Sequence, residues 1–251
     1  MPHTTIEGHR LHYEESGEGP PIILHHGLAQ WGDDWHRAGW VTALAQRSRV
    51  VIIDALGHGR SDRPHQIEPY RIENRANAVL TVADLLGIGQ FDFFGFSMGG
   101  RVAFQLAAST PERIRGLIIG GMHGRAPSLD RESLQKRAAT LRNGRLRVLE
   151  RAVGATSERP PNDPEALALS TEAILEWPGA ELRLHAIKSP VLMFGGEEDP
   201  LFPDAWATAS RLPGAEFERL PGRGHAASFN HSELTLPAVL RFLGQLDRGR
   251  T

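Results

Sequence analysis

The 251-residue chain contains no cysteine, and Lys136 and Lys188 are its only lysines. The lack of cysteine excludes disulfide bonds, thiolate catalysis and zinc sites built on cysteine. Acidic and basic residues nearly balance at a formal net charge of −2, so the composition does not predict binding to nucleic acid or to an anionic membrane. No apolar run is long enough to span a bilayer, and residues 1–19 lack the apolar core of a signal peptide. We therefore expect a soluble, cytoplasmic protein.

Strand-like and helix-like segments alternate along most of the chain. The strand-like segments are mainly continuous apolar runs, which are typical of a sheet buried on both faces. They cover residues 21–25, 49–54, 91–96, 114–119, 191–194 and 215–220, after an N-terminal hairpin at 4–14. Helical spacing of apolar residues occurs at 35–46, 72–86 and 232–246, and also directly after Ser97 and after Pro203. This pattern predicts an α/β fold with a mainly parallel central sheet covered by helices on both faces.

The alternation breaks once, between residues 123 and 186. This segment contains helical stretches at 127–153 and 165–175, separated by a turn-rich stretch at 157–164, and no convincing strand. We interpret 123–186 as a small helical cap inserted after the sixth strand, with residues 1–122 and 187–251 forming the core. An insert at that point leaves the sheet at the carboxyl ends of its strands, where open α/β sheets bind ligands.

The motif Gly95-Phe96-Ser97-Met98-Gly99 lies between an apolar strand and a helix-like segment. A serine on such a sharp strand-to-helix turn is held in a strained backbone conformation, with its hydroxyl exposed above the sheet. Glycines two residues before and after the serine leave room for the neighbouring strand and helix. The pattern predicts that Ser97 is a nucleophile, which needs a base and an acid to activate it.

The base and the acid are expected in loops that follow later strands. His225 lies in the glycine-rich loop 221–227 after the last predicted strand, where small neighbours let an imidazole reach the serine. His231 is the rival, but it lies at the start of a predicted helix and is better explained as a surface or capping residue. We expect His225 to be the general base.

Three consecutive carboxylates follow the strand at 191–194. Glu197 and Glu198 have longer side chains and are expected to face solvent, whereas Asp199 precedes Pro200 and is biased to an extended conformation. The pattern favours Asp199 as the acid that binds and orients the imidazole of the base. The alternative is that all three are solvated loop charges.

An oxyanion hole requires two backbone N–H donors. Met98, at the start of the helix after Ser97, supplies one, and Leu28, which follows Gly27 after an early strand, is expected to supply the other. His25 and His26 do not form a metal pair in this interpretation, because adjacent strand residues point to opposite faces. No metal and no cofactor are expected.

These motifs together resemble the α/β-hydrolase superfamily, in its small capped serine-hydrolase branch. The resemblance extends over nearly the whole chain outside the insert, and it rests on His26-Gly27, the segment 54–62, the motif around Ser97, residues 195–199 and Gly224-His225. The order serine, acid, histidine is the one this superfamily uses. The segment 54–62 is similar to a structural turn of the family. A serine nucleophile argues against haloalkane dehalogenases and soluble epoxide hydrolases, which need a carboxylate.

The substrate pocket is expected at the carboxyl ends of the strands. The residues predicted to line it are Trp31, His123, Trp177 and Phe202, beside Leu28 and Met98. Such a wall fits a neutral, moderately apolar ester or lactone. No arginine lies within the motifs in a way that identifies a carboxylate clamp, so an anionic substrate is not indicated.

The sequence therefore predicts a serine esterase or lactonase with a Ser97–His225–Asp199 triad. Three alternatives stay open: a cofactor-free perhydrolase or haloperoxidase, a carbon–carbon bond hydrolase, and a ligand receptor on a hydrolase scaffold. The early loop 26–31 lacks the serine- and glycine-rich form of carbon–carbon bond hydrolases, which makes that alternative weaker. The sequence does not identify the physiological substrate, the stereochemical preference, the oligomeric state or movement of the cap.

Overall fold

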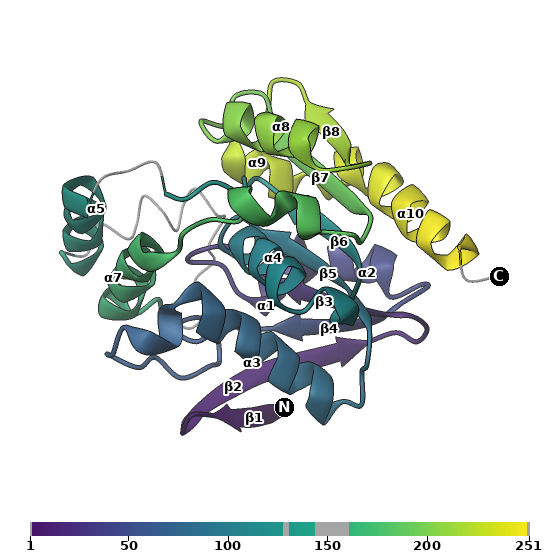
Figure 1. The fold of residues 1–251 in the computed structure, drawn as a ribbon. Coiled ribbons are helices and arrows are strands. Elements are labelled where there is room, and N and C mark those ends of the chain that lie inside the picture. The colour runs from purple at the N-terminus through teal and green to yellow at the C-terminus, as the bar shows by residue number, and fades with distance from the viewer. Residues whose placement is uncertain (1, 128–130, 144–160, 250–251) are drawn as a thin grey trace.

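A computed structural model of the protein describes residues 2–127, 131–143 and 161–249. The strands of this part of the chain form a single sheet in the order β1-β2-β4-β3-β5-β6-β7-β8 (Figure 1). Pairing is antiparallel at β1–β2 and β2–β4 and parallel everywhere else. The strands are β1 His3–Ile6, β2 His9–Ser16, β3 Pro21–His25, β4 Arg49–Ile53, β5 Phe91–Phe96, β6 Ile114–Gly120, β7 Val191–Gly196 and β8 Glu216–Leu220. The predicted mainly parallel sheet is confirmed.

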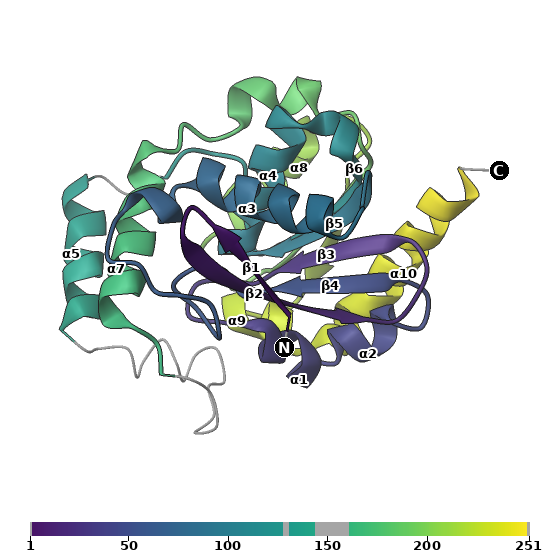
Figure 2. The ribbon, with the colours of Figure 1, turned by 90° about the horizontal axis from the view of Figure 1, so that it is seen from below.

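Both faces of the sheet are covered by helices, which explains why the central strands β3 to β7 are mainly apolar. Because side chains alternate along a strand, neighbouring residues enter different cores. Ile23 packs in one core, under the helices at residues 72–85, 98–109 and 202–211. Ile22 and Leu24 pack in the other, under the helices at residues 32–37, 40–44, 225–230 and 232–248. Figure 2 shows the sheet between these two helical layers.

The helices follow the predicted alternation with local differences. They are α1 Gly32–Arg37, α2 Trp40–Leu44, α3 Ile72–Leu85, α4 Met98–Ser109, α8 Phe202–Arg211, α9 His225–Asn230 and α10 Ser232–Arg248, with short 3-10 turns η1 Glu68–Tyr70 and η2 Pro111–Arg113. The helix predicted at 35–46 is two short helices, because Gly39 adopts a left-handed conformation with φ of 80° between them. Pro237 lies inside α10 without ending it.

Between β6 and β7 the regular elements of the described residues are helices and 3-10 turns, as predicted for the insert. They form α5 Arg131–Arg142, α7 Pro164–Glu172, η3 Ala173–Glu176 and η4 Glu181–Ala186. The parts of the predicted helix and turn that fall in 128–130 and 144–160 lie outside the described residues. Helices α5 and α7 pack side by side at one end of the molecule (Figures 1 and 2).

Helix α5 is joined to α7 by charge and by apolar packing. The Arg142 guanidinium bonds to Glu165 and to Glu172, with its shortest contact to each at 2.7 and 2.6 Å. A small core of α5 and α7 residues packs against the loop after β3, and it contains Ala29, Ala138, Leu141, Leu167 and Ala168, with Leu28 packed on it. The insert therefore lies over the loop that was predicted to hold an oxyanion donor. None of the helices in the described ranges is long and apolar enough to cross a membrane.

Candidate active site

Ser97 occupies the turn between β5 and α4 with φ of 53° and ψ of −108°. A positive φ is strained for a serine and is held only because the surrounding structure demands it. A Cβ on Gly95 would lie 2.1 Å from the Gly99 carbonyl oxygen, and one on Gly99 would lie 2.1 Å from the His25 carbonyl oxygen. The two glycines therefore allow strand, turn and helix to approach closely enough to force this conformation.

We expect Gly99→Ala to destabilise the fold by about 2–3 kcal/mol or more, because the added methyl meets the backbone of a central strand, which cannot move aside. Urea unfolding measures the change in the free energy of unfolding. Gly89→Ala is the matched control, since a Cβ there meets nothing within 4 Å. Equal stability of the two variants would contradict this account of the turn.

The three residues of the predicted triad lie in one hydrogen-bonded chain. His225 Nε2 lies 2.9 Å from Ser97 Oγ, and His225 Nδ1 lies 2.6 Å from Asp199 Oδ2. An ionised carboxylate only accepts, so Nδ1 carries the proton and Nε2 is left to accept the serine proton. The residues come from the N-terminus of α4, the loop after β7 and the first residue of α9. Parallel strands bring these loops to one edge of the sheet.

Burial distinguishes Asp199 from the two neighbouring glutamates. The Asp199 side chain is 2% exposed, and its Oδ1 accepts the Leu201 N–H at 2.9 Å. Glu198 is exposed, and Glu197 is also exposed and pairs with Arg219 at 2.6 Å. Only the aspartate is both sheltered from solvent and in contact with the imidazole. The rival histidine, His231, is exposed and bonds to Glu233 at 3.0 Å.

The loop after β3 is held against Ser97 by a buried histidine. His26 Nε2 accepts the Ala55 N–H at 3.0 Å, so Nδ1 carries the proton and donates to the Gly27 carbonyl at 2.8 Å. Burial lowers the pKa of His26 well below its usual value, which keeps the ring neutral in this role. The Gly27 N–H donates to Gln30 Oε1 at 2.9 Å, which closes the turn around Leu28.

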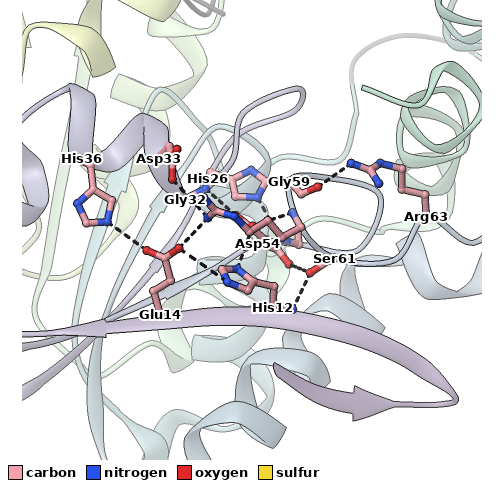
Figure 3. Close-up of polar contacts among 12 residues, drawn as sticks. His12, Glu14, His26, Gly32, Asp33, His36, Asp54, Gly59, Ser61 and Arg63 are labelled. Atoms are coloured by element: carbon pink, nitrogen blue, oxygen red, sulfur yellow. Dashed lines mark hydrogen bonds and ion pairs between the residues drawn. The ribbon is translucent and has the colours of Figure 1, made fainter. Parts of the chain in front are cut away.

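The segment 54–62 also contacts the loop after β3 through hydrogen bonds, which fits the structural role predicted for it. Asp54 Oδ1 accepts the Gly32 N–H at 2.6 Å, while Oδ2 accepts from the Arg60 N–H at 2.9 Å and lies 3.1 Å from His12 Nδ1. Figure 3 shows Asp54 at the centre of this network, between His12 on β2 and the start of α1. Within the described ranges, no cluster of three or more histidine or carboxylate groups could hold a metal ion.

A cavity of about 490 Å³ opens beside Ser97. Its wall combines the loop after β3, the start of α4, the loop after β6, the insert helices and the loop after β7. The lining residues are Leu28, Ser97, Met98, Arg101, Met122, His123, Pro127, Leu134, Arg137, Ser170, Thr171, Ile174, Asp199, Pro200, Leu201, Asp204 and His225. Leu28, Met98 and His123, which the sequence analysis named, are among these lining residues.

Three residues predicted to line the pocket lie elsewhere, and these predictions are corrected. Trp31 is 4% exposed, with the Arg60 guanidinium 4.6 Å above its ring. Trp177 is buried in the core beside α4, where its Nε1–H donates to Gln105 at 3.2 Å. Phe202 packs edge-to-face on a phenylalanine of β8. In each case a partner from another element holds the aromatic ring away from the cavity.

Three charged residues of the wall, Arg101, Arg137 and Asp204, were missed. Arg101 lies one helical turn after Met98 in α4, a spacing that places both side chains on the same face of the helix. Helical spacing from Ser97 could therefore have indicated it. Arg137 comes from α5, and no local sequence pattern indicates that it lines the cavity.

Comparisons with known proteins agree with this architecture. Residues 20–151 match the family model described as the alpha/beta hydrolase fold. A protein of Azorhizobium caulinodans with the provisional name carbamate hydrolase RutD is 27% identical over 95% of this chain and 96% of its own. The crystal structure of an enol-lactonase from Burkholderia xenovorans has a TM-score of 0.85 at 26% identity, covering 97% of this chain and all of that one.

The chain belongs to the α/β-hydrolase-fold family. Est816, described as an enzyme that degrades N-acyl homoserine lactones, is a further structural relative with a TM-score of 0.76 at 27% identity, covering 96% of this chain and 99% of that one. The known proteins that this chain is similar to thus include hydrolases of lactones and, by name, of carbamates.

Proposed function

We propose that this protein is a serine hydrolase that cleaves carboxylic esters, including lactones, through an acyl-enzyme. The observation that supports this most strongly is the chain Asp199–His225–Ser97, with contacts of 2.6 and 2.9 Å at the wall of a cavity. A serine is a poor nucleophile unless a correctly oriented base removes its proton, and this arrangement provides one.

In the proposed reaction, His225 removes the proton of Ser97 Oγ while that oxygen attacks the substrate carbonyl. The Leu28 and Met98 N–H groups donate hydrogen bonds to the developing oxyanion, each typically worth ~3–4 kcal/mol in the transition state. His225 then protonates the leaving alcohol. Water attacks the acyl-enzyme with His225 as its base, which releases the acid and restores Ser97. Asp199 holds the imidazole tautomer and stabilises the imidazolium.

Labelling with a fluorophosphonate, combined with turnover of short aryl esters, tests this function. We expect stoichiometric modification of Ser97 in the native protein, multiple turnovers on the esters, and neither in Ser97→Ala. Modification at another residue, or turnover that persists without the Ser97 hydroxyl, would refute the assignment.

The labelling result and further activity assays separate the alternatives. Labelling of Ser97 without turnover of any ester would favour a ligand receptor, and peroxide-dependent halogenation would favour a haloperoxidase. A carbamate is the second candidate substrate, because a relative matched over nearly its full length carries that name and the same acyl chemistry applies. Faster turnover of an aryl carbamate than of the matched aryl ester would select it.

A further inference from the structure

Two arginines line the cavity without a counter-ion from the protein. Arg101 lies on α4 and Arg137 on α5, so the core and the insert each contribute one. Arg101 Nε is buried and has no hydrogen-bond partner. Within the part of the chain that the structure describes, neither side chain forms a hydrogen bond or an ion pair. Arg137 is exposed to solvent, whereas the buried Nε of Arg101 is unfavourable without a partner, because buried charges are normally paired.

The other charged groups of the cavity wall are already engaged. Asp199 bonds to His225, and Asp204 forms an ion pair with Arg125 on the surface. His123 adds no positive charge near neutral pH, because burial and the nearby Arg101 lower its pKa. The wall therefore carries two uncompensated positive charges and no free negative one.

Arg101 stays protonated in this setting. Burial lowers the pKa of its guanidinium to about 10, and the charge of Arg137 acts in the same direction. That value is still well above neutral pH, so the group is a cation whose environment disfavours the charge. An anion placed between the two guanidinium groups would offset the cost of burying the Arg101 charge and the repulsion between the two cations.

Ser170 adds a neutral donor to the same wall. Its Oγ accepts from Arg75 Nη2 at 2.9 Å, so its own hydroxyl proton is available to donate toward the cavity. Arg75 is itself buried and contributes a further positive charge behind Ser170. Arg101, Arg137 and Ser170 line one cavity, and two guanidinium groups with a hydroxyl form a donor set suited to carboxylate oxygens.

We propose that the substrate carries a carboxylate, which lies between Arg101 and Arg137 while the scissile carbonyl lies against Ser97. This proposal rests on the proposed function and specifies its substrate class. Arg101 is four residues after Ser97, about 6 Å along the helix axis, so the carboxylate lies only a few bonds from the reacting carbonyl. The substrate class is thus a small ester or lactone with an acid group, in place of the neutral one that the sequence indicated.

Paired substrates test the proposal. We expect an aryl hemiester of glutarate to be cleaved with a kcat/KM at least tenfold above that of the aryl pentanoate. The ratio of the two values should fall at least tenfold in Arg101→Gln and in Arg137→Gln, and recover in part in Arg101→Lys. Arg131→Gln removes the same charge from α5 at an exposed position away from the cavity wall and should leave the ratio unchanged.

Binding to Ser97→Ala gives a readout that does not depend on catalysis. Calorimetry with monomethyl glutarate should give a Kd that rises at least tenfold when Arg101→Gln is added. If the proposed function failed, no variant would cleave either ester, yet this binding would still depend on Arg101. If the present proposal failed, Ser97 would cleave the neutral ester as well as the anionic one, and neither arginine variant would change the ratio.

A competition experiment distinguishes the kind of anion. Glutarate should displace monomethyl glutarate from Ser97→Ala at concentrations where inorganic phosphate does not. Stronger displacement by phosphate would overturn the carboxylate assignment and point to a phosphate-bearing substrate.

Discussion

Ser97→Ala should lower kcat on a good ester substrate by about 10⁴- to 10⁶-fold, because removal of a triad nucleophile leaves only the oxyanion donors and substrate binding. The substitution deletes one oxygen and keeps the Cβ, so the contacts of the turn around φ of 53° are unchanged. Stopped assays of product formation, with circular dichroism to verify folding, measure the effect.

The matched control for this variant is Ser210→Ala. Ser210 lies on α8, where its hydroxyl donates to a carbonyl of the same helix, and it is exposed. We expect its kcat to match the native value. A loss of less than tenfold in Ser97→Ala would mean that the serine in the turn is not the nucleophile.

Asp199→Asn should reduce kcat by about 10⁴-fold with little change in structure. The reason lies in the second contact of the carboxylate: Oδ1 accepts the Leu201 N–H at 2.9 Å. In the variant the amide oxygen keeps that bond, so the amide nitrogen faces His225 Nδ1 as a donor. The imidazole must then carry its proton on Nε2, where it cannot accept the proton of Ser97.

Glu198→Gln is the control for Asp199→Asn, since it makes the same change of charge at the adjacent, exposed residue. The pH profile of kcat distinguishes the two accounts of the effect. A tautomer effect should diminish as rising pH supplies hydroxide as an alternative base. Equal losses in the two variants would show that Asp199 acts only through the general charge of the loop.

The fold was largely predictable from the sequence because its signals are local. Alternating residues such as Ile22 and Ile23 enter opposite cores, and a strand with no polar face indicates a sheet covered on both sides. The confirmed α/β architecture and the family follow from this pattern and from the motif around Ser97. The boundary errors arose where one residue overrode the periodicity, as Gly39 does by splitting the helix predicted at 35–46.

For the candidate site, the sequence indicated the triad better than the pocket. Asp199 and His225 were selected from the loop context of each residue, and in the structure His225 lies 2.6 Å from Asp199 and 2.9 Å from Ser97. The pocket was predicted less well. Trp31 was chosen as a large apolar residue near a strand end and Trp177 as one in the insert, but both rings are buried against partners remote in sequence.

What the sequence determined by itself is the turn at residues 95–99, the alternation of strands and helices, and the order along the chain of the proposed nucleophile, acid and base. Each of these depends on neighbouring residues, through backbone sterics and the periods of strand and helix. Only the tertiary structure decided that Arg101 and Arg137 face one cavity without counter-ions. Helical spacing relates Arg101 to Ser97, but the position of Arg137 depends on how α5 and α7 pack over the loop after β3. Contacts between residues distant in sequence leave no local pattern to detect.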